Sequence, residues 1–166
     1  LMAQQDFLAS HHIVNGVYPV ADAFATSVTT DYVSLANYRK ATWIIHTGVA
    51  TGGTANGVIT VLAASDAAAT GAGAVAFRYR RCASSTTVDT WSALTEVAST
   101  GLVMTVGSNQ MYEVEVTAAD VEGADPGNPF VALKVTEDTN DPIVAGVLII
   151  LSDPRYGTGT PVTAIV

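Results

Sequence analysis

The most apolar stretch of the chain is residues 143–151, which read Ile-Val-Ala-Gly-Val-Leu-Ile-Ile-Leu and are bounded by Pro142 and Pro154. Nine residues are too few to cross a bilayer as a helix, which takes about 20. The β-branched content and the flanking prolines favour a strand. Because the stretch has no polar alternation, we expect both of its faces to be covered, one by the protein's own core and one by a neighbouring subunit.

Seven further segments show strand signals, most of them with apolar and polar residues in alternation. They are residues 31–38, 41–47, 58–63, 74–82, 102–106, 111–117 and 130–137. Glycine-rich and polar turns separate them, and the four-residue turn 107–110 predicts a hairpin between its two neighbours. About eight strands with almost no helical period predict an all-β protein. We expect a single two-sheet sandwich of jelly-roll type, with an immunoglobulin-like sandwich as the alternative.

The alternation also predicts which side chains fill the space between the two sheets, because every second residue of a strand faces the same way. Ten residues are expected to point inward: Trp43, Ile45, Ile59, Val61, Phe77, Tyr79, Val114, Val116, Leu133 and Val135.

The two ends of the chain lack a regular period. Residues 1–27 contain Gly16 and Pro19, so we interpret them as an extended N-terminal arm, followed by a β-sandwich domain over 28–156 and a tail over 157–166. Such segments become ordered against another surface. Deletion of residues 1–24 should then leave the domain folded; the alternative makes the arm an edge strand of the domain. The residues predicted to form an interface with another subunit or a protein partner are Ile143, Val144, Val147, Ile149, Leu151, Val17, Tyr18, Phe24, Ile165 and Val166.

Composition narrows the function classes. Only 13% of the residues are charged and 49% are hydrophobic, against roughly 25% charged in an ordinary soluble domain. The net charge of −8 argues against nucleic-acid binding, which needs a basic surface. Cys82 is the single cysteine and rules out an intrachain disulfide. The first residues lack the basic and apolar regions of a signal peptide, so we expect synthesis in a reducing cytoplasm and no membrane partner.

Two charged clusters each allow two interpretations. Arg78, Arg80 and Arg81 form either a patch for an acidic partner or a ladder with Glu113 and Glu115, which have the same two-residue spacing; we favour the ladder. The turn 137–141 contains oxygen ligands in Glu137, Asp138, Asn140 and Asp141, but its spacing matches no EF-hand loop, so we expect no metal there.

The remaining reactive side chains lack the partners that chemistry needs. His11 and His12 point apart in an extended segment, and His46 is expected to be a packed or interface histidine. Cys82 is expected to be a packed thiol. Trp43 is assigned to the core, which leaves Trp91 as the aromatic residue suited to ligand binding. Because no nucleophile, base or phosphate loop is recognisable, we expect no enzyme activity and no cofactor.

Four stretches between residues 28 and 156 resemble the small all-β virion proteins of tailed bacteriophages, especially those that decorate or cement the capsid. They are residues 33–38 (Val-Ser-Leu-Ala-Asn-Tyr), 76–80 (Ala-Phe-Arg-Tyr-Arg), 107–112 (Gly-Ser-Asn-Gln-Met-Tyr) and 148–156 (Leu-Ile-Ile-Leu-Ser-Asp-Pro-Arg-Tyr). The resemblance implies a structural protein on the outer capsid surface that binds the major capsid protein lattice. It also implies a homo-oligomer, for which a trimer is preferred. A tail or head–tail structural protein and a carbohydrate-binding module are the alternatives.

Overall fold

The computed structural model describes residues 6–53, 55–82, 89–138, 142–156 and 165. Regular structure in this part of the chain is almost entirely strand, with two short helices, α1 (Phe7–Ser10) and α2 (Ala118–Ala124). The strands are β1 (His12–Val20), β2 (Ser27–Thr29), β3 (Val33–Ser34), β4 (Tyr38–Ala50), β5 (Ala55–Ala64), β6 (Gly73–Val75), β7 (Phe77–Cys82), β8 (Thr95–Val97), β9 (Leu102–Thr105), β10 (Met111–Thr117), β11 (Phe130–Thr136) and β12 (Ile143–Pro154).

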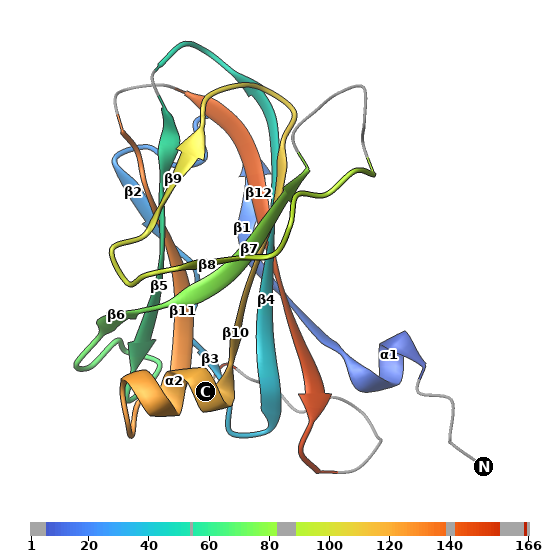
Figure 1. Ribbon diagram of the computed structural model, residues 1–166, viewed down its shortest axis with the longest axis vertical. Helices are drawn as coiled ribbons and strands as arrows, with labels where there is room; N and C mark the ends of the chain where they lie inside the picture. The colour runs from blue at the N-terminus through green and yellow to red at the C-terminus, as the bar shows by residue number, and fades with distance from the viewer. Residues whose placement is uncertain (1–5, 54, 83–88, 139–141, 157–164, 166) are drawn as a thin grey trace.

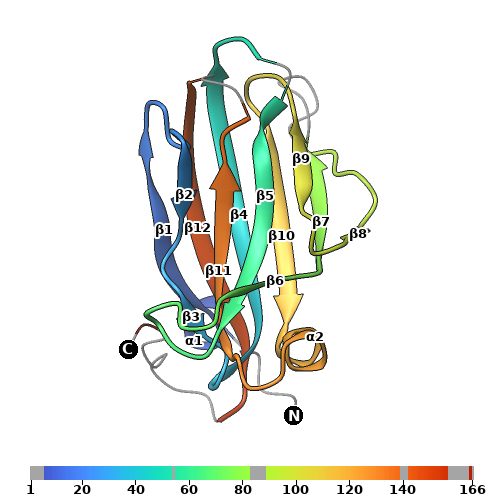
Figure 2. The ribbon, with the colours of Figure 1, turned by 90° about the vertical axis from the view of Figure 1, so that its left-hand side faces the viewer.

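The strands form two antiparallel sheets that pack face to face along the long axis of the molecule (Figures 1 and 2). The first sheet has the order β1-β12-β4-β10-β7-β8. The second has the order β2-β11-β5-β6, with β3 paired to β11 and β9 paired to β5. The predicted all-β sandwich is therefore confirmed.

The strand pairing is nested. Strand β1 pairs with β12, β2 with β11, β4 with β10 and β5 with β9, so the first half of the chain pairs with the second half in reverse order. Taken in this order, successive pairs of strands alternate between the first and the second sheet. An antiparallel ribbon rolled up in this way is a jelly roll, as the sequence predicted, and the immunoglobulin-like alternative does not apply.

The core lies between the sheets and contains the side chains that alternation assigned to it. Nine of the ten predicted residues are buried, and Tyr79 is half-buried against the same cluster. In the first sheet, inward-facing residues of neighbouring strands are paired with one another. Trp43 of β4 is opposite Val114 of β10 on one side and opposite Ile149 of β12 on the other. The period-two pattern is thus a sound guide to the core of this protein.

The expectation of an N-terminal arm outside the domain differs from the structure at residues 12–20, which form β1, the edge strand of the first sheet. Its pairing with β12 is interrupted by register shifts between Asn15 and Val17 and between Val17 and Val20. These irregularities break the alternation by which a strand is recognised. Gly16 is required here, because a Cβ atom would lie 3.0 Å from Thr30 Cγ2 and 3.1 Å from the Val147 carbonyl oxygen.

The predicted hairpin between 102–106 and 111–117 is also wrong, because β9 belongs to the second sheet and β10 to the first. The connection crosses from sheet to sheet around the buried Gln110. The Gln110 amide nitrogen donates to the carbonyl oxygens of Thr105 and Gly107, each at 3.1 Å, and its Oε1 accepts from the Tyr112 hydroxyl at 3.0 Å. A side chain therefore supplies the hydrogen bonds that a hairpin would supply with backbone groups.

Several short elements were not predicted. Strands β2 and β8 have three residues each, too few for an alternation to show. The predicted strand 74–82 is divided into β6 in the second sheet and β7 in the first. Within 31–38, residues 33 and 34 form β3, while Val33 and Leu35 are both buried. Helix α2 follows Thr117, whose side-chain oxygen accepts from the Asp120 N–H at 3.1 Å. Thr117-Ala118-Ala119-Asp120 is an N-cap signal that could have revealed this helix.

Candidate interaction surface

The outer face of the first sheet changes from apolar to charged across its width. The register aligns one row of outward residues from strand to strand: Leu148 is opposite Ile44, Ile44 is opposite Glu113, and Glu113 is opposite Arg80. The strands β1, β12 and β4 therefore carry an apolar half of this face, and β10 and β7 carry a charged half.

The charged half is the predicted ladder. Arg78 Nη2 lies 3.1 Å from Glu115 Oε1, and Arg80 pairs with Glu113. The hydrogen bond that the Arg80 guanidinium donates to Glu113 raises the pKa of Arg80 above its ordinary value. The Arg80 guanidinium also lies 4.8 Å from the centre of the Trp91 ring, in a cation–π contact. Arg78 and Arg80 are thus engaged by neighbours on the same sheet.

The ladder should contribute little to stability, because its members are partly exposed to water. In a double-mutant cycle with Arg78→Ala and Glu115→Ala, we expect a coupling energy of about 0.2–1 kcal/mol in urea unfolding. A coupling energy indistinguishable from zero would mean that the pair is not formed in solution.

The apolar half carries charge only at one end, where Lys40 of β4 pairs with Asp153 of β12 and Arg39 is exposed. Strand β1 contains no acidic residue, lysine or arginine, and β12 contains none before Asp153. Val144 and Leu148 on the outer side of β12 are 43% and 46% exposed, and Ile13, Tyr18 and Val20 are exposed on β1. We call these five residues the apolar surface. The second face of 143–151, which we expected to be covered, is therefore open in the single chain.

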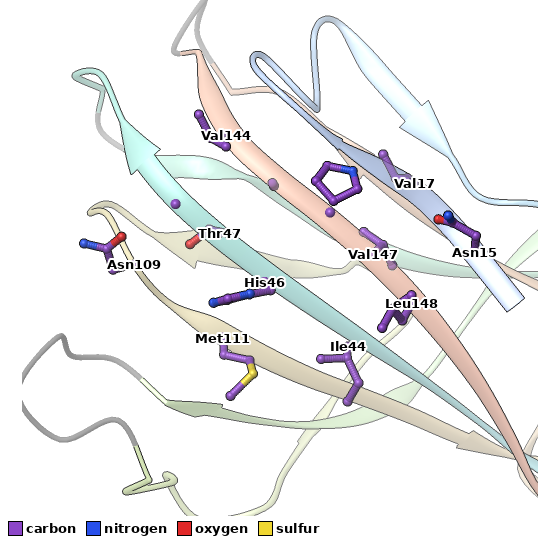
Figure 3. A pocket seen from close by; sticks show the side chains of 14 residues that line it. Asn15, Val17, Ile44, His46, Thr47, Asn109, Met111, Val144, Val147 and Leu148 are labelled. Atoms are coloured by element: carbon purple, nitrogen blue, oxygen red, sulfur yellow. The ribbon is translucent and has the colours of Figure 1, made fainter. Parts of the chain in front are cut away.

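An open groove of about 480 Å³ lies in the apolar half (Figure 3). It is bordered by β1, β12, β4 and the start of β10, and none of its lining residues is acidic, lysine or arginine. The lining residues are Asn15, Val17, Pro19, Ile44, His46, Thr47, Gly48, Asn109, Met111, Val144, Ala145, Gly146, Val147 and Leu148.

Two glycines keep this groove hollow. A Cβ atom on Gly146 would lie 3.1 Å from Pro19 Cγ, and one on Gly48 would lie 3.3 Å from Val144 Cβ. Both glycines occur inside strands, where glycine costs stability and often marks a close approach of another group. The sequence signal for the groove was therefore Gly146 within the most apolar strand.

The predicted interface residues divide into three groups. Val144, Tyr18 and Ile165 are exposed, with Tyr18 at 75%, and Val17 is half-buried at the groove. Five others have side chains that are buried in the protein's own core, where exposure to a partner was expected: Ile143, Val147, Ile149, Leu151 and Phe24. Val166 lies outside the described residues.

The structure leaves His46 exposed rather than packed, with His11 and His12 half-buried and Cys82 buried. His46 is exposed on the floor of the groove, beside Met111 in the register. The ring of His11 stacks on Phe7 at 4.2 Å, whereas His12 faces Tyr38 at 6.2 Å. Cys82 is buried, as predicted for a packed thiol.

The two candidate ligand sites, Trp91 and the acidic turn 137–141, each contact another part of the protein. Trp91 is half-buried and its ring is in contact with Arg80. In the acidic turn, Glu137 Oε2 accepts a hydrogen bond from the Thr26 N–H at 2.9 Å, while Asn140 and Asp141 lie outside the described residues. Within the described ranges, no group of three or more His, Cys, Asp or Glu side chains is arranged to hold a metal ion. Neither helix in this part of the chain is long and apolar enough to span a bilayer.

A second exposed apolar feature was missed at the N-terminus. Helix α1 projects beyond the sandwich at the end where β12 finishes (Figure 1). It presents Phe7 and Leu8, which are 51% and 81% exposed. We call this pair the apolar knob. The adjacent apolar pair Phe7-Leu8 in a segment without a period was the available signal.

Comparison with known proteins leaves the chain without an assigned family. No protein-family model matches it, and no curated protein matches it. Among solved structures, it is similar to the SPBc2 prophage-derived protein YomS, with 14% sequence identity and a TM-score of 0.39. The match covers 86% of this chain and 95% of that chain. A similarity of this size does not extend to function.

Proposed function

We propose that this protein is a non-enzymatic virion structural protein that decorates a bacteriophage capsid. In this proposal it binds the lattice of the major capsid protein from outside and stabilises the shell by bridging neighbouring subunits, without a cofactor. The four sequence stretches that resemble phage decoration proteins support the phage setting. The apolar surface is the structural observation that carries the proposal.

The physical argument begins with charge. A chain with a net charge of −8 keeps one edge of its first sheet free of acidic residues, lysine and arginine over nine residues of β1. Exposed edge strands of soluble proteins are usually protected by charged residues, because an uncharged edge associates with other chains. Pro19 and the two register shifts make the C-terminal part of β1 a poor template for pairing with another strand, whereas His12 to Asn15 pair regularly with β12. An uncharged edge with exposed apolar side chains fits a protein partner.

The first test is the composition of purified particles. We expect the protein to be present at a fixed ratio to the major capsid protein, measured by quantitative mass spectrometry. A few copies per particle would instead indicate a tail or head–tail position. Absence from particles would overturn the proposal.

The second test changes the edge strand. Ile13→Asp and Tyr18→Asp should each weaken binding to particles that lack the protein by at least about tenfold, because burying a large apolar side chain is worth about 1.5–3 kcal/mol. Co-sedimentation measures the bound fraction. Val103→Asp is the matched control, because Val103 is exposed on β9 in the other sheet. Equal losses for all three variants would contradict attachment through β1.

A further inference from the structure

The groove and the apolar knob lie at opposite ends of the first sheet. His12, which follows α1, is level with Leu151, whereas the groove extends along β12 to Val144. The near end of the groove, at Leu148, is three residues or about 10 Å of strand from Leu151, and its far end, at Val144, is seven residues or about 23 Å away. The pairing of β1 with β12 holds α1 beyond Leu151, on the side away from Val144.

The knob is already ordered before it meets a partner. The Ser10 hydroxyl donates to the Asp6 carbonyl oxygen at 2.9 Å, and His11 Nδ1 lies 3.1 Å from the Phe7 carbonyl oxygen. The stacking of His11 on Phe7 fixes the ring. Leu8 is left pointing into solvent at the outermost position. A preorganised apolar protrusion loses little conformational entropy when it docks.

The groove has the complementary properties. Its hollow follows from Gly146 and Gly48, its walls include Val144, Leu148 and Pro19, and it contains no acidic residue, lysine or arginine. The titratable group on its floor is His46, and the acidic group beside the knob is Asp6. Two copies of a chain with a net charge of −8 repel each other least where such an uncharged surface meets the knob.

We propose that the groove binds the apolar knob of a second copy of this chain, so that Phe7 and Leu8 of one subunit dock between β1 and β4 of the next. The knob and the groove are different parts of the molecule, so the contact joins unlike surfaces, and each subunit offers both. Repetition of such a contact forms a ring if its rotation closes, or a reciprocal pair if two subunits exchange knobs. This proposal shares Val144 and Leu148 with the apolar surface and leaves Ile13, Tyr18 and Val20 of β1 for attachment to a capsid.

Light scattering of the full chain at tens of micromolar gives the first test. The wild type should be an oligomer, and Leu8→Asp should reduce it to a monomer that keeps the circular dichroism spectrum of the folded wild type. Val144→Asp should do the same from the groove side. Leu94→Asp is the matched control, because Leu94 is exposed in the segment before β8, and it should keep the oligomer mass. A monomeric wild type, or an unchanged mass for Leu8→Asp, would overturn the proposal.

Thiol crosslinking tests the same contact without disrupting it. A chain with both Leu8→Cys and Val144→Cys, treated with a short bis-maleimide, should give crosslinked species that Leu94→Cys with Val144→Cys does not give. Cys82 is buried and should react little in either chain. Equal crosslinking of the two chains would overturn the proposal, and this result stands even if Val144→Asp fails to fold.

Different variants test the knob-in-groove contact and the attachment to a capsid. Leu8→Asp should act on the oligomer in the absence of particles, and Ile13→Asp should act on particle binding. A monomeric protein that binds particles, and loses this binding through Val144→Asp, would show that a capsid segment occupies the groove.

Discussion

Deletion of residues 1–24 is expected to unfold the free protein at room temperature. It removes β1, which covers the edge of β12 from Leu151 to Ala145, together with Phe24, which is fully buried. Loss of a buried phenylalanine side chain alone costs about 3–5 kcal/mol. With a strand removed as well, the loss is comparable to the total stability of about 5–15 kcal/mol of a typical domain.

Deletion of residues 1–11 is the matched control. It removes α1 and leaves β1 in place, so the midpoint of urea unfolding should stay close to that of the full chain. Circular dichroism follows both truncations. If the protein without residues 1–24 keeps its unfolding midpoint, β1 is dispensable and the segment behaves as the detachable arm that the sequence predicted.

The parts of the fold that were predictable are those with an uninterrupted local period. Glu113 and Glu115 alternate with Val114 and Val116, and Arg78 and Arg80 flank Tyr79. In each strand the apolar residues therefore indicate the face that points into the core. Because the two strands also have opposite charge at the same spacing, their pairing in the ladder followed from the sequence. The structure adds the register, which places Glu113 opposite Arg80.

The candidate surface was less predictable because its central strand, β12, has no polar residue between Ile143 and Leu151. Residues 143–151 are apolar at every position, so the sequence alone does not distinguish Val144, which is exposed, from Val147, which is buried. Only the position of β12 between β1 and β4, with the second sheet on one side, separates the two faces. The groove depends in addition on Pro19 of β1 lying against Gly146, a contact between residues 127 positions apart that no local pattern reports.

Replacement of Trp43 is the second change with a large expected effect. Trp43 is fully buried in the main core cluster. Trp43→Ala should lower the free energy of unfolding by about 3–5 kcal/mol, because it removes the transfer energy of the side chain and leaves a cavity. Trp91→Ala, at the half-buried position beside Arg80, should cost about 1 kcal/mol through the lost cation–π contact.

Trp43→Phe separates packing from polarity at the same site. Among the residues that the structure describes, the buried indole Nε1 of Trp43 has no hydrogen-bond partner, and an unpaired buried donor costs about 1–3 kcal/mol. Phenylalanine removes this donor and most of the cavity, so we expect it to cost less than half as much as alanine in urea unfolding. If phenylalanine costs as much as alanine, the indole nitrogen has a partner in solution, and a bound water in the core becomes the explanation.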